Sequence, residues 1–272
     1  YKNHWSAYSI LIICVCFEIC RIILKNKTRI LFRSKLIQCL FIVILILILS
    51  IFYSNSTSGV IIASFAIISC TVYLFSVYKL WKKFKLRITI ACISIFIIVF
   101  NVEFVQNRIE SLFHGDSFRI GLYADIIQSI KLKTFWGNGI NSYKTFNGIF
   151  QSQFISDARS ENLLNAHSFY IPVTVHAHSD FLQIINEFGF MGAVLLIFPL
   201  FFLTLHRILN LKHFEFPYIT IGILCLLLYG LIDFPFRNLA VISLFFMLLP
   251  LMFRTSNRFT RSRNKTISTC RT

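Results

Sequence analysis

Two histidines and an aspartate stand close together in the segment HAHSDFLQIINEFG, residues 176–189. His176, His178 and Asp180 are residue types that bind metal ions, but a catalytic metal usually needs three protein ligands, and the nearest further histidine is His167. We therefore expect no metal and no cofactor. Two interpretations stay open: one histidine is a general base, because neutral imidazole accepts a proton from a hydroxyl near neutral pH, or both are polar loop residues at the level of lipid headgroups.

The residues that follow predict a helix with a polar stripe. Asp180 and Gln183 have the spacing of a capping box. Asp180, Gln183 and Glu187 recur at helical spacing, with Asn186 beside them. Ionisable residues inside a membrane span usually face a cavity or the protein interior, because lipid solvates charge poorly. We therefore expect the stripe to continue the histidine site into the protein, which favours the general-base interpretation.

Transmembrane helices are the elements that must position these residues. Of the 272 residues 56% are hydrophobic, and the mean hydropathy is +0.71, which is typical of an integral membrane protein. Apolar stretches long enough to cross a bilayer occur about seven times, at roughly residues 6–24, 36–53, 59–78, 88–105, 181–205, 216–232 and 238–253. In the fifth, Gly189 and Ala193 have the spacing of a face that packs closely on another helix. The chain begins at Tyr1 without the pattern of a signal peptide, so we expect a piece of a longer protein.

Basic residues predict which ends of these helices face the cytoplasm, since cytoplasmic loops hold the excess of Lys and Arg. The basic clusters fall on one side of the seven-span arrangement, at 25–35, 79–87, 207–212 and 254–272. The other side holds two short turns and one long segment, at 54–58, 233–237 and 106–180. We therefore predict an all-α polytopic membrane protein with one long external loop. The predicted divisions are four spans in 1–105, the loop in 106–180, three spans in 181–253 and a basic cytoplasmic tail in 254–272.

The net charge of +16 is explained largely by these basic clusters. Lys and Arg beside membrane spans orient the protein and contact anionic headgroups, at about 1 kcal/mol per residue. Membrane lipids are therefore the expected partners of the clusters, and nucleic acid is not. The eight cysteines lie in predicted spans and in the tail, so we interpret them as small hydrophobic residues and expect no disulfide in the loop.

The external loop contains a predicted amphipathic helix from about residue 117 to 132. Asp116 or Ser117 is its expected N-cap. Its apolar face is expected to consist of Ile120, Tyr123, Ile126, Ile127 and Ile130. Arg119 lies in the first turn, where the helix macrodipole disfavours a cation. It is either an exposed arginine paired with Asp116 or part of a site for an anion such as phosphate.

We expect this amphipathic helix to lie on the bilayer surface or on the other helices. The next segment, FWGNGINSYKTF (135–146), predicts a tight turn around Gly137 and Gly139 followed by a short element. Residues 147–175 have no assignable pattern.

Four segments in this order resemble the O-antigen ligase and polymerase family. They are R-x-x-x-Y from Arg119, F-W-G-N-G-I-N-S-Y at 135–143, H-S-D-F-L-Q-I-I-N-E-F-G-F-M-G at 178–192 and D-F-P-F-R-N at 233–238. The resemblance covers about residues 50–250. It implies a multi-span protein of the bacterial inner membrane whose large loop is periplasmic, and a metal-independent, inverting glycosyltransferase. The implied donor is a glycan linked to undecaprenyl diphosphate, and the implied acceptor is lipid A core or another glycan.

The resemblance implies that His178 and Arg119 are essential. Combined with the chemistry above, His178 is the expected base, Arg119 is expected to hold the diphosphate, and Arg237, His176 and Glu187 are expected to bind or orient the substrates.

The chain departs from the family pattern at two places. Ser179 stands where Asn is usual, and Ser56, Thr57, Ser58 and Gly59 stand where many members have a Ser-Arg pair.

The acceptor separates the possible activities. O-antigen ligation to lipid A core is favoured, followed by O-antigen or exopolysaccharide polymerisation and then by protein O-oligosaccharyl transfer. A transporter or flippase is the alternative from another class. It is disfavoured because the sequence shows no inverted repeat and its ionisable residues cluster at the external end.

Overall fold

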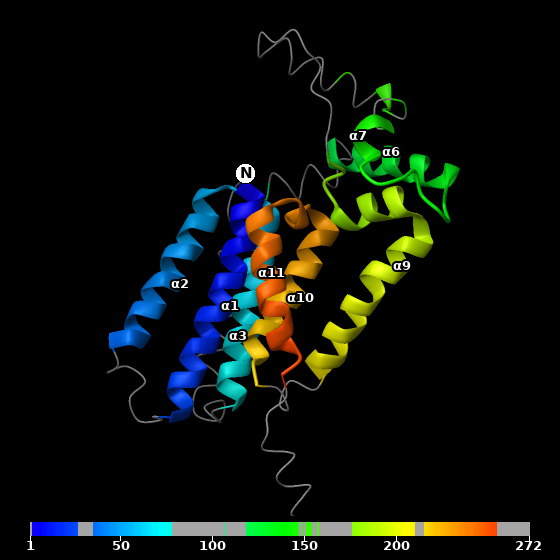
Figure 1. The fold of residues 1–272 in the computed structure, drawn as a ribbon. Helices are drawn as coiled ribbons and strands as arrows, with labels where there is room; N and C mark the ends of the chain where they lie inside the picture. The colour runs from blue at the N-terminus through cyan, green and yellow to red at the C-terminus, as the bar shows by residue number, and fades with distance from the viewer. Residues whose placement is uncertain are drawn as a thin grey trace, which may run out of the picture.

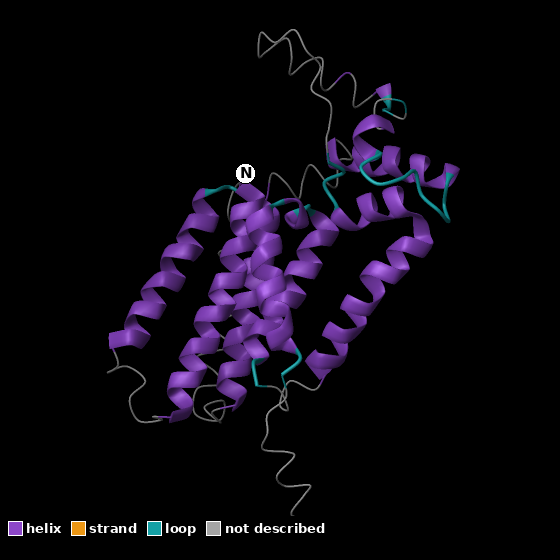
Figure 2. Ribbon diagram, in the orientation of Figure 1, coloured by secondary structure: helices purple, strands orange, loops and turns teal. Residues whose placement is uncertain are grey.

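The computed structural model describes residues 2–26, 35–77, 106, 118–146, 149, 151–153, 157, 176–209 and 215–254. Within these ranges all regular structure is helical, as predicted, and Figure 1 and Figure 2 show the arrangement. Six apolar helices coincide with predicted spans: α1 (Lys2–Asn26), α2 (Lys35–Tyr53), α3 (Thr57–Val77), α9 (Asp180–Leu209), α10 (Pro217–Ile232) and α11 (Leu239–Met252). The predicted span at 88–105 lies outside the described residues. By length and composition α1, α2, α3 and α9 can cross a membrane, and α10 and α11 are shorter apolar helices.

The bundle is built around α1, which contacts α2, α3, α10 and α11 (Figure 1). α1 and α10 approach closely at Gly222, where an added Cβ atom would lie 2.9 Å from the Cβ atom of Cys14. Since lipid is as apolar as these side chains, close packing of small residues stabilises such contacts. Cys14, Cys70 and Cys225 are buried free thiols of this core, which agrees with their interpretation as small hydrophobic residues.

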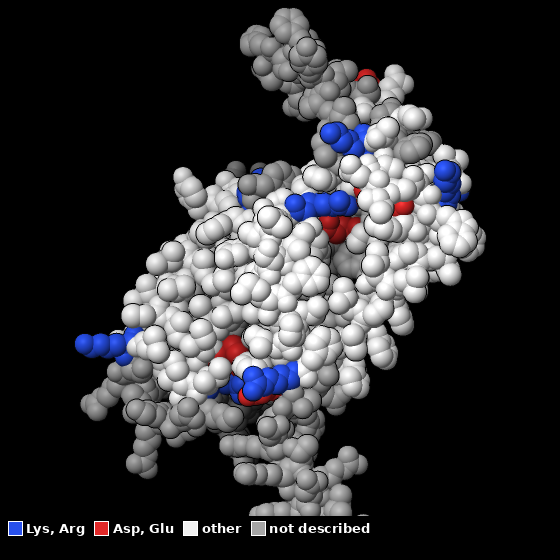
Figure 3. All heavy atoms as spheres, in the orientation of Figure 1, with Lys and Arg blue, Asp and Glu red and all other residues white. Residues whose placement is uncertain are grey.

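The outward faces of α2 and α9 are apolar. Their exposed side chains include Ile42, Leu45, Ile46, Leu195, Phe198 and Phe202. On the face seen in Figure 3, charged side chains gather toward the two ends of the helices, and the band between them is uncharged. An uncharged belt of this kind fits the hydrocarbon core of a bilayer.

At one end of the bundle, α1 caps the start of α10. The buried carboxylate of Glu18 accepts a hydrogen bond from the Tyr218 N–H at 2.9 Å. The N-cap residue of α10, Phe216, provides no side-chain cap of its own, so Glu18 satisfies a free N–H group that would otherwise lack a partner. Arg21 pairs with Glu18 and donates to the Glu215 carbonyl, which ties the end of α1 to the same place.

At the opposite end three connections meet: the turn before α3, the segment before α9 and the turn between α10 and α11. The Asp180 N–H donates to the Asp233 carbonyl at 3.1 Å, and Lys2 Nζ donates to the Asn55 carbonyl at 3.1 Å. The seven-span topology requires these connections to lie at one end. The assignment of this end to the outside of the membrane remains a prediction from the basic residues.

α6 (Phe118–Leu132) confirms the predicted loop helix to within one residue, and it packs on α9 (Figure 1). Its buried side chains are Leu122, Asp125, Ile126 and Ser129. The buried face therefore differs from the predicted one, because Ile127 is 45% exposed. The expected N-cap residues and the side chain of Ile120 are not among the described parts of the chain.

α9 is broken at Gly189, which has φ 70° and ψ −179° between helical residues. Carbonyl groups before such a break and N–H groups after it lose their partners within the helix. The predicted role of Gly189, close packing on another membrane helix, is wrong. An added Cβ atom at Gly189 would collide with the backbone of Phe135 and Gly137, so the glycine permits a close approach of the turn after α6.

The turn after α6, residues 133–142, supplies the partners that the break removes. The joining hydrogen bonds are Asn138 N to Asn186 O (2.8 Å), Gly139 N to Glu187 O (2.9 Å), Phe190 N to Thr134 O (2.8 Å) and Met191 N to Phe135 O (3.4 Å). The two glycine-containing motifs therefore interlock through main-chain atoms. The predicted tight turn is confirmed, and the short element after it is α7 (Tyr143–Phe146).

Side chains strengthen this junction. Ser129 Oγ and Asn138 Nδ2 both donate to Asn186 Oδ1 at 2.9 Å, and Asn138 Nδ2 also lies 3.2 Å from Ser129 Oγ. Ser129 and Asn186 are buried. α6, the turn and the first part of α9 thus form one unit joined to the bundle.

The junction predicts a large difference between two glycines of the turn. Gly137 and Gly139 both have positive φ, 71° and 102°, but an added Cβ atom at Gly137 would collide with the backbone of α9, whereas Gly139 has no atom within 4 Å. Gly137→Ala should therefore lower the free energy of unfolding by about 3 kcal/mol or more, because crowding against α9 adds to backbone strain. Gly139→Ala introduces strain alone and should lower it by only about 1 kcal/mol. The measurement is unfolding by SDS in mixed micelles, followed by circular dichroism; equal losses would show that crowding against α9 is unimportant.

Candidate active site

The histidine segment ends in a helix cap. Ser179 precedes α9, and its Oγ atom accepts a hydrogen bond from the Leu182 N–H at 3.3 Å. Ser179 is therefore the N-cap, and the predicted capping box starting at Asp180 is wrong by one residue. The Asn that the resemblance implies and this chain's Ser both cap helices well, so the departure at this position preserves the local structure.

The polar stripe of α9 is buried, as predicted. Asp180, Gln183, Asn186 and Glu187 are each at most 3% exposed. Gln183 Oε1 accepts from the Ala177 N–H at 3.3 Å, and Gln183 Nε2 donates to Glu187 Oε1 at 2.7 Å. Gln183 therefore joins the histidine segment to Glu187, one turn further into the protein.

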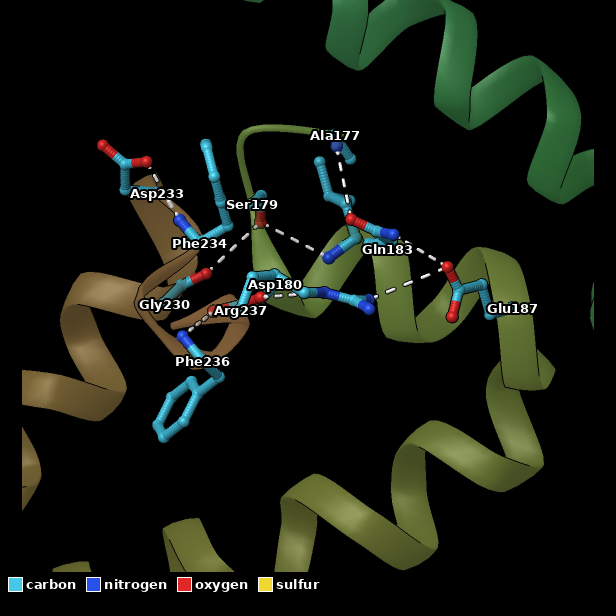
Figure 4. A network of polar contacts seen from close by, with 11 residues as sticks. Ala177, Ser179, Asp180, Gln183, Glu187, Gly230, Asp233, Phe234, Phe236 and Arg237 are labelled. Carbon is cyan, nitrogen blue, oxygen red and sulfur yellow. Dashed lines mark hydrogen bonds and ion pairs between the residues drawn. The ribbon is translucent and has the colours of Figure 1, made fainter. Parts of the chain in front are cut away.

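Arg237 lies between the two carboxylates of the stripe, Asp180 and Glu187 (Figure 4). Its Nε atom is 3.7 Å from Asp180 Oδ1, and its Nη2 atom is 3.7 Å from Glu187 Oε1. Asp180 Oδ2 also accepts from the Phe236 N–H at 2.8 Å. The carboxylates are nearly inaccessible, whereas the Arg237 side chain is 28% exposed. One face of the guanidinium group is thus held by protein, and the rest can contact a ligand.

Three histidine rings surround the buried ring of Phe234. The ring centroids of His176 and His178 lie 4.9 Å from that of Phe234, and the centroid of His4 lies 5.2 Å from it. His4 comes from the start of α1, far away in the sequence. The sequence did not single out His4 or Phe234, since nothing in a phenylalanine-rich chain indicates which aromatic ring a distant histidine will contact.

His178 has an unusual backbone. Its φ of 54° places it in the left-handed region, which few residues other than glycine adopt. Its carbonyl oxygen accepts a hydrogen bond from Tyr123 Oη of α6 at 3.0 Å, and the same hydroxyl lies 3.2 Å from the Ile232 carbonyl oxygen. α6 thereby holds the residue that the sequence predicts as base. Such strain is found most often at functional sites.

Arg119 lies in the first turn of α6, one helical turn before Tyr123. Residues four apart share a face of a helix, so the backbone of Arg119 is on the face of α6 that carries Tyr123. The Arg119 side chain is not described, and its predicted role in holding a diphosphate remains a prediction.

The surroundings of His176 favour its neutral form. Burial lowers the pKa of His176, and the positive charge of Arg237 and the neighbouring His4 lower it further, against an opposing effect of Glu187. His176 Nδ1 is buried without a hydrogen-bond partner among the described residues. The neutral imidazole is therefore the favoured form of His176 over a wider pH range than for an ordinary histidine.

Asp233 holds the turn that carries Phe234 and Arg237. It is fully buried. Its carboxylate accepts from the Phe234 N–H at 3.0 Å, from Ser58 Oγ at 3.2 Å and from Asn3 Nδ2. Because its carbonyl also accepts from the Asp180 N–H, Asp233 joins α1, α3 and the start of α9.

Ser56 and Ser58, which lie where the resemblance implies a Ser-Arg pair, belong to this buried support. Ser56 Oγ donates to Asn3 Oδ1 at 2.7 Å and lies 3.2 Å from Tyr229 Oη, and Ser58 Oγ lies 3.4 Å from Tyr229 Oη. Both serines are buried, so their side chains stabilise the turns beneath the site.

The structure brings most of the predicted site residues together, and for one of them, Arg119, it describes only the backbone. His176, His178, Glu187 and Arg237 lie around the junction of α9 with the turn between α10 and α11, and Arg119 is placed by its backbone alone. Within the described ranges no three His, Cys, Asp or Glu side chains converge on a point that could hold a metal ion.

A protein-family model described as O-antigen ligase matches residues 41–197, more than half of the chain. The match includes α6, the interlocking turn and the histidine segment. No curated protein and no solved structure matches the chain. The match confirms the resemblance carried by the sequence motifs and indicates a membrane enzyme of the glycan-transfer type that uses lipid-linked glycans. The chain belongs to the O-antigen ligase family.

Proposed function

We propose that this chain transfers a glycan from undecaprenyl diphosphate to an acceptor hydroxyl at the periplasmic face of the inner membrane, with lipid A core as the acceptor. One observation carries the proposal: in a chain of the O-antigen ligase family, a histidine with a strained backbone packs against Phe234, and the same turn carries an arginine held by two buried carboxylates. A base and an anion-binding group are what such a transfer needs. The end of the bundle is where a lipid-linked diphosphate would present its sugar.

His178 is the proposed general base. The Nδ1 atom of His178 is buried, so we assign proton transfer to Nε2. The acceptor O–H gives its proton to Nε2 while the acceptor oxygen forms a bond to the anomeric carbon. The bond from that carbon to the diphosphate breaks, and its electron pair leaves with the diphosphate. Attack from the opposite face inverts the configuration at the anomeric carbon.

Arg119 and Arg237 are the proposed diphosphate-binding residues. Guanidinium groups stabilise the negative charge that develops on a departing phosphate, which is the role of a metal ion in other transferases. Asp180 and Glu187 are proposed positioning residues, since each holds Arg237 from the protein side. His176 and Glu187 are proposed to orient the acceptor or the base. No step in this scheme requires a divalent metal.

Substitution of the base tests the chemical step. In the complete protein, His178→Ala should lower the rate of glycan transfer by about 10²–10⁴-fold, because that is the usual contribution of a general base. His206→Ala, at the other end of α9, should keep the rate and serves as the matched control. The measurement is transfer of purified lipid-linked donor in proteoliposomes. A normal rate in His178→Ala would remove the central assignment.

Arg119→Ala should weaken the binding of donor and slow its departure, and Arg119→Lys should restore part of the activity because it restores the charge but not the two-pronged hydrogen bonding. Arg254→Ala, at the end of α11 far from the histidines, is the control. Full activity in Arg119→Ala would show that other residues bind the diphosphate.

Chelation with EDTA should leave the rate of the unmodified enzyme unchanged, because no step of the proposed scheme uses a divalent metal. Loss of activity on chelation would show that a metal takes part.

The charges around His176 predict two opposite shifts. Arg237→Gln should raise the pKa of His176, because it removes a cation, and Glu187→Gln should lower it, because it removes an anion. Both shifts can be followed by NMR titration of the labelled histidine ring in detergent micelles, with the signal of His206 as internal control. Identical titration of His176 in both variants would show that neither charge acts on it.

Deletion of the complete gene distinguishes the acceptors. If the protein ligates O-antigen to lipid A core, deletion should leave core without glycan and should accumulate long chains on the lipid carrier. Gel analysis of the surface glycan measures both. Core capped by single repeat units would instead assign polymerisation, and unchanged lipopolysaccharide with loss of glycan from proteins would assign protein glycosylation.

A further inference from the structure

The turn after α6 exposes large apolar side chains. Leu132, Phe135, Trp136 and Ile140 all face outward, and Trp136 is 82% exposed. These side chains are not on a loosely attached loop, because the main chain beneath them is hydrogen bonded to both sides of the break in α9. Exposed aromatic side chains on a rigid main chain indicate a surface that contacts a membrane or another molecule.

The exposed surface continues onto α9. Phe190 N donates to the Thr134 carbonyl, and beyond it the side chains of Phe190, Met191 and Leu195 are exposed in turn. α9 is one of the helices long and apolar enough to cross a membrane, so its outward face is a lipid-contacting surface. The apolar side chains of the turn therefore extend this surface past the break. Figure 2 shows the turn (teal) running beside the bend of α9.

The charged residues of this surface indicate how deep in the bilayer it lies. Lys131 and Lys133 are exposed beside the apolar side chains. The whole segment from 130 to 146 has three lysines and no acidic residue. Tryptophan with flanking lysines is the composition of the headgroup layer, where the indole ring lies between water and hydrocarbon and lysine reaches lipid phosphate. These lysines favour a lipid surface over a protein partner, because a protein surface of ordinary composition has no excess of negative charge for them to contact.

We propose that residues 131–140 form a membrane anchor that occupies the headgroup layer of the leaflet next to the histidine site, with Trp136 and Phe135 inserted and Lys131 and Lys133 on anionic headgroups. The same turn closes the break in α9 and is covalently joined to α6, whose Tyr123 holds the His178 carbonyl. The anchor thus sets the height of α6 and His178 above the bilayer. This consequence rests on the proposed function; the membrane contact itself does not.

Fluorescence quenching tests the membrane contact without any assay of activity. Trp5→Phe and Trp81→Phe leave Trp136 as the one tryptophan of the chain. The variant is placed, one copy per disc, in nanodiscs whose lipids are brominated either close to the headgroup or near the chain ends. Bromines close to the headgroup should quench more strongly, and acrylamide in the water only weakly. Strong quenching by acrylamide with none by either lipid would overturn the anchor, as would emission that neither reagent affects, which would show that protein covers Trp136.

A paired substitution tests the effect on height. Phe135→Ser with Trp136→Ser should leave the helical content unchanged and lower transfer from a lipid-linked donor several-fold, with a smaller loss for a donor carrying a short, water-soluble chain. Lys144→Gln, on α7 beyond the anchor, is the control. Equal losses for both donors would overturn the role in height while leaving the quenching result intact. If the anchor is confirmed but His178→Ala remains fully active, the proposed function fails and the membrane contact stands.

Discussion

The structure depends on one constraint, which is that peptide groups near a bilayer cannot remain without hydrogen-bond partners. α9 breaks this rule locally at Gly189 and would be unstable there alone. The turn after α6 restores the missing hydrogen bonds, and it fits only because Gly137 and Gly189 both lack a side chain. The break and the turn therefore require each other, and this mutual requirement attaches the described loop helix to the membrane helices.

The second support of the site is a set of buried polar groups at the end of the bundle. Asp233 binds α1 and α3 through its carboxylate and the start of α9 through its carbonyl. Groups of this kind are costly to bury unless each is hydrogen bonded, so they fix a single arrangement. His178 lies between the two supports, held by Tyr123 from the loop side and packed against Phe234 from the bundle side.

Periodicity and charge predicted most of the helices, because long apolar runs and helical spacing are local properties. The loop helix and the burial of the polar stripe followed from the same local patterns. Pairing between distant segments did not: Gly137 and Gly189 each belong to a recognisable motif, but spacing alone cannot show that they touch. The choice between Ser179 and Asp180 as N-cap also depends on a distant residue, since Arg237 and the Phe236 N–H occupy the carboxylate of Asp180.

The backbone of His178 has a consequence for how the protein can change. A residue with a side chain in the left-handed region costs about 1 kcal/mol relative to glycine. The most stable amino acid at this position is therefore not the one that carries an imidazole. Under the proposed mechanism stability and activity oppose each other at this residue, so a variant selected only for heat resistance would gain by losing the proposed base. In the proposed mechanism, the strain at His178 is the cost in stability of placing the base at this position.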